Sequence, residues 1–272
     1  MRKVGIMSMQ RIANYGSFLQ AYALKQLIEE VGCNVEFVDY HVGAPVIAEN
    51  ADSKNKVVRK IEKGLETFQY RAPLAHKLSF IRYKQSFAQK YMPLLGIADE
   101  MNYNPTVDCL VIGSDEVFNC IQKNSNVGYS PELFGKNNHA KKLITYAASF
   151  GNTTLEKLEK YKKANEVGAL LKKFDAISVR DANSGTIVEQ LTGKEPVYNL
   201  DPVLTYDYMN CCDKIPQVQT NEKYLILYAY AGRISNDEAD WIAASLAMLL
   251  ISTVPSAISV TSFSKSLLTS SG

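Results

Sequence analysis

Polar residues that can bind an anion open the helix expected after the first strand, in the segment 14–20 (NYGSFLQ). The first N–H groups of a helix lack partners within it, and the helix dipole adds positive charge, so a phosphate or carboxylate can dock there. Asn14, Gly16 and Ser17 would line this site. The alternative, which the local pattern favours, is that Asn14 and Ser17 cap the helix while Gly16 permits the turn. The segment lacks a GxGxxG motif and does not predict dinucleotide binding.

Two carboxylates and an amide follow the expected strand 107–112, in the segment 113–119 (GSDEVFN). Asp115 can accept a proton from a substrate hydroxyl or bind sugar hydroxyls. Ser114 and Asn119 are further candidates for substrate binding. The pattern fits a helix cap equally well, so both interpretations stay open at this point.

Two more polar loops follow strands at the same expected edge of the sheet. The segment 146–151 (YAASFG) contains Ser149, and the segment 178–184 (SVRDANS) places Arg180 directly after a strand. A guanidinium in this position can bind a phosphate or carboxylate with two parallel hydrogen bonds. The alternative is an ion pair between Arg180 and either Asp181 or another loop acid.

Metal and redox chemistry find little support in the sequence. The three histidines are far apart, and His41, which follows the second strand, is interpreted as a surface or turn residue. The five cysteines form no CxxC motif and are expected to be reduced thiols in a cytosolic protein. The adjacent pair Cys211 and Cys212 is interpreted as incidental. We predict no metal site.

The elements that must position these loops are read from hydrophobic periodicity. Leu19, Ala23, Leu27 and Val31 recur at helical spacing between two short apolar runs, which predicts a βαβ unit and a parallel sheet. Further expected elements are a helix over 154–173, a helix from Asp181 to Thr192 and a turn at Asp201. The predicted strands cover 3–7, 35–40, 107–112, 143–149, 176–179 and 196–199. Together they predict a doubly wound α/β fold.

The segment 52–91 alternates aromatic and basic residues and is predicted to form two amphipathic helices broken near Pro73. Phe80, Tyr83, Phe87 and Tyr91 lie at helical spacing, which is typical of a buried stripe rather than of a nucleic-acid surface. The whole chain of 272 residues has a formal net charge of only +2, with 46% hydrophobic and 21% charged residues. This composition predicts a soluble globular protein and no nucleic-acid partner.

Three domain segments are predicted: a Rossmann-like domain over 1–206, a linker over 207–222 and an incomplete second lobe over 223–272. A strand over 224–230 and a helix through Trp241 begin that lobe. The 31 residues 242–272 contain no acidic residue, one base at Lys265 and nine serines. An ordinary buried helix and strand, a membrane tail anchor and an out-of-frame tail all compete here, and we favour the out-of-frame tail. The short apolar run at the start predicts no export signal.

Five motifs taken in order resemble the polysaccharide pyruvyl transferase family across about residues 1 to 240. They are Asn14-Tyr15-Gly16-Ser17 with Leu19-Gln20-Ala21, Gly113-Ser114-Asp115 with Asn119, Ser149-Phe150-Gly151, Ser178-Val179-Arg180-Asp181 and Leu200-Asp201-Pro202. The resemblance implies a two-lobed fold like that of GT-B glycosyltransferases, with the active site in the cleft between two Rossmann-like halves. It also implies transfer of pyruvate from phosphoenolpyruvate, the donor substrate, onto sugar hydroxyls as a ketal. No further cofactor is implied.

The resemblance assigns Arg180 to the donor anion, and we expect Asp115 to orient or deprotonate the acceptor hydroxyl. Asn14, Gly16 and Ser17 would line the cleft, with Ser114, Asn119 and Ser149 beside them. The expected acceptor is a saccharide or a lipid-linked saccharide in bacterial surface polysaccharide synthesis. The chemistry would take place in the cytoplasm, with peripheral membrane association through the acceptor.

One family feature is missing from the sequence. The family carries a C-terminal Ser-x-Arg-x-His segment that contacts the donor and supplies acid catalysis, whereas no histidine follows His139 here. We therefore expect the C-terminal lobe to be truncated and this chain to have little activity. Two alternatives remain: a glycosyltransferase of GT-B architecture that uses a nucleotide sugar, and a non-catalytic module that binds glycans.

Overall fold

The computed structural model describes residues 1–47, 74–122, 127–209, 211 and 241–242. The chain divides into two compact units, Met1–Tyr208 and Met209–Gly272, and every helix and strand given below belongs to the first. The strand predicted over 224–230 and the tail from 243 onward lie outside the described residues. The predicted lobes, with a linker at 207–222, stay a prediction.

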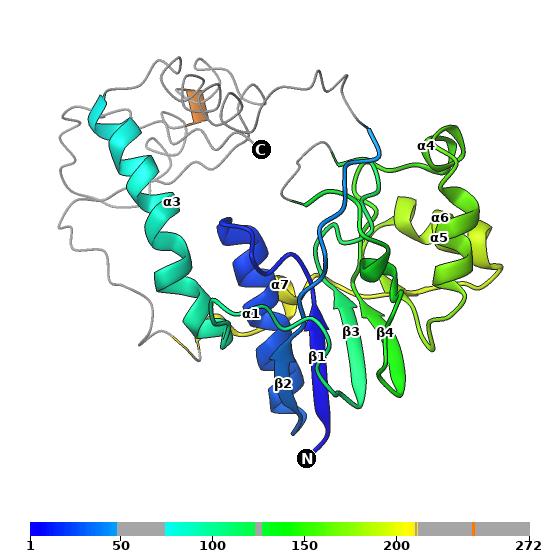
Figure 1. Cartoon of the computed structure of the whole chain (residues 1–272), viewed down its shortest axis with the longest axis horizontal. Helices are drawn as coiled ribbons and strands as arrows, with labels where there is room; N and C mark the ends of the chain where they lie inside the picture. Colours follow the sequence, from blue (N-terminus) through cyan, green and yellow to red (C-terminus); the bar gives the residue numbers. More distant parts are fainter. Residues whose placement is uncertain (48–73, 123–126, 210, 212–240, 243–272) are drawn as a thin grey trace, which may run out of the picture. The chain divides into compact units, whose positions relative to one another are not determined.

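Four parallel strands form the main sheet in the order β2-β1-β3-β4 (Figure 1). The strands are β1 (Lys3–Met7), β2 (Asn34–Phe37), β3 (Cys109–Gly113) and β4 (Lys142–Tyr146). The central strands β1 and β3 are almost wholly buried, which agrees with their continuous apolar sequences. The predicted α/β class with a parallel sheet is confirmed, and the arrangement is Rossmann-like.

A second parallel pair consists of β5 (Ser178–Val179) and β6 (Val197–Tyr198). Isolated parallel bridges from Ile144 to Ala176 and from Ala148 to Val179 connect it to the β4 segment. The loop that carries Arg180 therefore leaves a strand beside the carboxyl end of β4, as the sequence predicts.

Helix α1 (Tyr15–Glu30) connects β1 to β2, but its buried face differs from the predicted stripe. Leu19 is 36% exposed and Val31, which caps the helix, is 77% exposed. The residues that α1 buries are Phe18, Ala21, Tyr22, Ala23 and Leu24. A single stripe assumes one covering surface, whereas α1 packs on β2, α3 and α7, so its buried face is wider and rotated.

Helix α3 (Leu74–Leu95) is the described part of the segment predicted to form two helices. Residues 52–73, where the first helix was predicted, lie outside the described residues, as does the side chain of Phe80. Phe87 is fully buried, and Tyr83 and Tyr91 are half-buried against the aromatic rings at the start of α1. The predicted aromatic stripe is thus a packing surface in the described part of this helix.

The predicted helix over 154–173 is two helices, α4 (Leu155–Lys160) and α5 (Ala164–Leu171). The break falls where Lys162 adopts a left-handed backbone with φ of +57°, which no helix can accommodate. The short helix η1 (Pro131–Phe134) was not predicted. Its Phe134 stacks on Phe118 in the hydrophobic core, with ring centroids 4.7 Å apart.

Helix α6 (Ala182–Thr192) confirms its predicted bounds. Asp181 caps it through the N–H of Ser184, and Gly193 ends it in the left-handed conformation. The turn predicted at Asp201 is wrong in detail, because Asp201 is the N-cap of a short helix, α7 (Pro202–Thr205), with proline in its first turn.

Candidate functional site

The site lies where the chain changes direction across the sheet, between the carboxyl ends of β1 and β3. The connection after β1 leads to β2 on one side, while β3 lies on the other side, and such a point is where parallel sheets bind ligands. Ser17, in the first turn of α1, donates its hydroxyl to Asp115 after β3, with 2.7 Å between Oγ and Oδ2. This bond joins two loops that are 98 residues apart in sequence.

Asp115 is held in an unusual backbone conformation, with φ of +65°. Its second carboxylate oxygen accepts the N–H of Glu116 at 2.8 Å, and its carbonyl accepts the N–H of Ser149 at 3.1 Å. Gly113 precedes it at φ of +134°, where a Cβ would lie 2.2 Å from the carbonyl oxygen of Tyr146. Only glycine permits this close approach of β3 to β4, and the approach directs the Asp115 loop.

Arg180 lies beside Asp115 and is paired with a second carboxylate. Its Nη1 donates to Oδ2 of Asp201, and its Nη2 lies 4.0 Å from Oδ1 of Asp115. The three side chains are 16–21% exposed, so the group is largely shielded from solvent but still accessible to it. The structure thus answers the question that the sequence left open for Arg180: its partner is Asp201, while Asp181 is engaged in capping α6.

Two residues that were not predicted as site residues complete this group. Asp201 binds the N–H of Val203 through Oδ1 and the side-chain amide of Gln20 through Oδ2. Ser17 and Gln20 are three residues apart on α1, so they lie on one face of the helix. This spacing is the sequence signal that could have identified Gln20 as a site residue. We call Ser17, Gln20, Asp115, Arg180 and Asp201 the switch-point cluster.

Two buried oxygens at this cluster have no hydrogen-bond partner among the residues that the structure describes. They are Oγ of Ser114, whose residue is fully buried next to Asp115, and Oε1 of Gln20. Buried polar atoms are nearly always paired in folded proteins, because each unpaired one costs free energy. Both atoms are therefore available to hydrogen-bond a ligand.

Three other residues predicted for the site make hydrogen bonds within the fold. Asn14 caps α1 by accepting the N–H of Gly16 at 2.7 Å, so that N–H is not free for an anion. Ser149 donates to Asp181 and accepts the N–H of Gly151. Asn119 binds Glu116 through its amide nitrogen and accepts from the Thr153 hydroxyl and the N–H of Ile121.

The phenol of Tyr40 is affected by the charges of Asp115, at the site, and of Asp39, in the loop after β2. Burial, followed by the negative charges of Asp115 and Asp39, raises the pKa of its phenol to about 12. The Tyr40 hydroxyl is therefore neutral at physiological pH and cannot serve as a base there.

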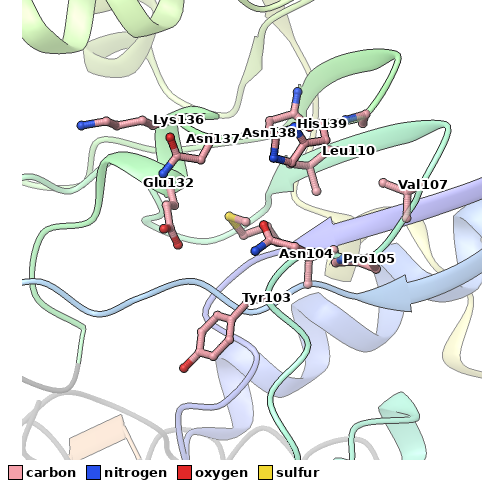
Figure 2. Close-up of a pocket in the computed structure, with 13 residues that line it drawn as sticks. Tyr103, Asn104, Pro105, Val107, Leu110, Glu132, Lys136, Asn137, Asn138 and His139 are labelled. Atoms are coloured by element: carbon pink, nitrogen blue, oxygen red, sulfur yellow. Dashed lines mark hydrogen bonds between the residues drawn. The ribbon is translucent and has the colours of Figure 1, made fainter.

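A separate small pocket is formed by the loop before β3 and the loop before β4 (Figure 2). Its lining includes Tyr103, Glu132 and His139 but no residue of the switch-point cluster. Next to it the ring of His41 stacks on Tyr103, with centroids 4.0 Å apart, and Nδ1 lies 3.0 Å from Glu132. His41 is exposed, as predicted, and belongs to this loop contact.

Within the described ranges, no group of three or more histidine, cysteine, aspartate or glutamate residues is arranged to hold a metal ion. Among the helices that the structure describes, none is both long and apolar enough to cross a bilayer.

Comparison with known proteins identifies one family. The family model described as "Polysaccharide pyruvyl transferase" matches residues 14–259, most of the chain. Searches of curated proteins and of solved structures gave no match. The matched range contains the whole switch-point cluster.

Proposed function

Because the chain belongs to the polysaccharide pyruvyl transferase family, a family of transferases, we propose that the switch-point cluster binds phosphoenolpyruvate and a saccharide for pyruvyl transfer. The observation that carries the proposal is the placement of Arg180 within 4.0 Å of Asp115, which is itself bonded to Ser17. A cation for the donor and a carboxylate for the acceptor thus lie side by side.

Ketal formation sets clear chemical requirements. A proton adds to the methylene carbon of phosphoenolpyruvate, C2 becomes cationic, and two sugar hydroxyls bond to C2 while the C–O bond to phosphate breaks. Of the two hydroxyl protons released, one balances the proton taken up by the methylene and the other leaves with phosphate or solvent. The protein must therefore bind an anion, accept a hydroxyl proton and supply an acid.

The cluster meets the first two requirements. Arg180 uses Nη1 for Asp201, and in the described part of the chain Nη2 makes no hydrogen bond, so this edge can bind the donor's carboxylate or phosphate. Asp115 is placed to orient or deprotonate the acceptor hydroxyl. Ser114 Oγ is buried and has no partner within the described ranges, so it is available to the same ligand.

The net charge of the switch-point cluster limits how tightly it can bind the donor. One guanidinium faces two carboxylates, so the cluster does not carry the excess positive charge that a trianionic donor favours. No histidine follows His139 in the sequence, which leaves the acid and a second cation unassigned. We therefore propose that this chain binds the donor weakly and turns it over slowly, in the cytoplasm, with a polysaccharide or lipid-linked acceptor.

Calorimetric titration of the purified chain with phosphoenolpyruvate tests the proposal. We expect saturable binding to wild type, at least about 30-fold weaker binding to Arg180→Ala, and no change for Arg82→Ala, an exposed arginine on α3. No heat from phosphoenolpyruvate, together with stabilisation by a nucleotide diphosphate sugar, would identify a glycosyltransferase instead. Glycan binding that Arg180→Ala leaves unchanged would identify a non-catalytic module.

A further inference from the structure

Asp201 occupies a special place in the switch-point cluster because three separate elements donate to it. The N–H of Val203 binds Oδ1, which makes Asp201 the N-cap of α7, and Gln20 on α1 and Arg180 after β5 both bind Oδ2. Helices α1 and α7 pack against each other, so two of these donors lie on one rigid support (Figure 1). The carboxylate cannot swing away without losing a helix cap and the Gln20 bond together.

Two roles are open to such a carboxylate. It can compete with the ligand by occupying the guanidinium until an anion displaces it, or it can hold the guanidinium in one orientation. The three-way anchoring favours holding, because a competitor must leave readily. The orientation also fits: with Nη1 fixed on Asp201, Nη2 is directed toward Asp115, 4.0 Å away.

Gln20 strengthens this interpretation. Its amide nitrogen binds Asp201, while its carbonyl oxygen is buried and has no partner in the described part of the chain. An apolar side chain would avoid that cost, so the residue contributes through its amide donor. Together with Ser17, which binds Asp115 from the same helix, Gln20 lets α1 fix both carboxylates that flank Arg180.

We propose that Asp201 and Gln20 are positioning residues that lock the Arg180 guanidinium in the orientation that receives the donor anion. The identity of that anion rests on the proposed function. The locking itself does not, and it can be measured without any ligand.

The direct test is NMR of the arginine side chains in the ligand-free protein, with the Arg180 signal assigned by its loss in Arg180→Lys. We expect hindered rotation of the guanidinium in wild type, seen as separate Nη resonances. These should merge in Asp201→Ala and merge partly in Gln20→Ala and in Asp201→Asn, because the single amide oxygen of asparagine cannot accept from both Val203 and Arg180. Thr154→Ala, which removes the N-cap of α4, is the matched control for the stability lost with a cap. Unchanged Arg180 resonances in folded Asp201→Ala would overturn the proposal.

Titration with phosphoenolpyruvate separates holding from competing. Holding predicts that Asp201→Ala raises Kd about tenfold, that Asp201→Asn raises it less, and that Thr154→Ala stays within about threefold of wild type. Competition predicts tighter binding in both Asp201 variants, and that result would also overturn the proposal. If wild type binds no phosphoenolpyruvate while the Arg180 resonances still depend on Asp201, the proposed function fails and the positioning role stands.

Discussion

Two arginine–carboxylate groups lie at the same edge of the main sheet, and they differ in how completely they are paired. In the first, Asp39 after β2 is 4% exposed and accepts Nε and Nη2 of Arg11 at 2.6 and 2.7 Å. Gln10 and the N–H of Asn102 also donate to it, and Arg11 reaches two carbonyls of the loop 98–100. We call this the Asp39 clamp.

The switch-point cluster shares these residue types but is open. One edge of Arg180 has no hydrogen bond within the described residues, and two neighbouring oxygens, of Ser114 and Gln20, are buried and unpaired. The Asp39 clamp ties the loop after β1 to the loop after β2, and each nitrogen of its guanidinium already donates to a protein oxygen. Unpaired hydrogen-bond donors and acceptors, rather than the presence of an ion pair, therefore distinguish a candidate binding site from a group that only stabilises the fold.

The largest effect should come from breaking the clamp with Arg11→Ala. This substitution removes the guanidinium that pairs with the buried Asp39 carboxylate, so we expect the free energy of unfolding to fall by about 3 kcal/mol. Urea denaturation measures it. Lys25→Ala, which breaks a helix-surface pair with Glu29, is the control and should cost less than about 0.5 kcal/mol. A loss equal to that of the control would mean that the clamp is not a brace.

Arg180→Ala should show the opposite division between stability and binding. We expect its unfolding free energy to change by less than about 1 kcal/mol, because the pair is partly exposed. Its affinity for phosphoenolpyruvate should fall by about 2 kcal/mol or more, which corresponds to the 30-fold loss given above. Urea denaturation and calorimetry on both Arg11→Ala and Arg180→Ala test this contrast. Equal losses of stability in the two variants would contradict the distinction between the Asp39 clamp and the switch-point cluster.

The raised pKa of Tyr40 predicts how stability depends on pH, because the charges of Asp115 in the cluster and Asp39 in the clamp add to the effect of burial. Its pKa is about 12 in the folded protein, against 10.0 for an ordinary tyrosine, so the folded state keeps a proton that the unfolded state releases. This contribution to stability is complete below pH 10 and is lost as the pH rises toward 12, at about 1 kcal/mol per pH unit. Urea denaturation at pH 9 and pH 11 should show a smaller decline for Tyr40→Phe than for wild type. Equal declines would show that the two carboxylates and burial do not act on Tyr40.

The sequence predicted the sheet and the loops that meet at its edge, because apolar runs and capping residues are local signals. Ser17, Asp115 and Arg180 were identified in this way, and the structure brings them together. Gln20 and Asp201 were not assigned to the site, although both stand in the family motifs, because the hydrogen bond that joins them spans 181 residues and neither motif predicts it. The roles of Ser149 and Asn119 stay a prediction, since a polar residue after a strand can equally well hydrogen-bond a neighbouring loop, as both do here.

Ser17→Ala should give the smallest effect, and it tests whether the donor-binding and acceptor-binding residues of the cluster act separately. The substitution removes one hydrogen bond to a carboxylate that keeps its backbone partner at Glu116, so we expect about 1 kcal/mol less stability. Because Ser17 fixes Asp115 rather than Arg180, donor affinity should change little, while any turnover with a saccharide acceptor should fall. Ser86→Ala on α3 is the control, since its hydroxyl donates to the carbonyl of Tyr83 in its own helix. If Ser17→Ala weakened donor binding as much as Arg180→Ala, the donor and acceptor halves of the cluster would not be separable, and the cluster would act as one unit.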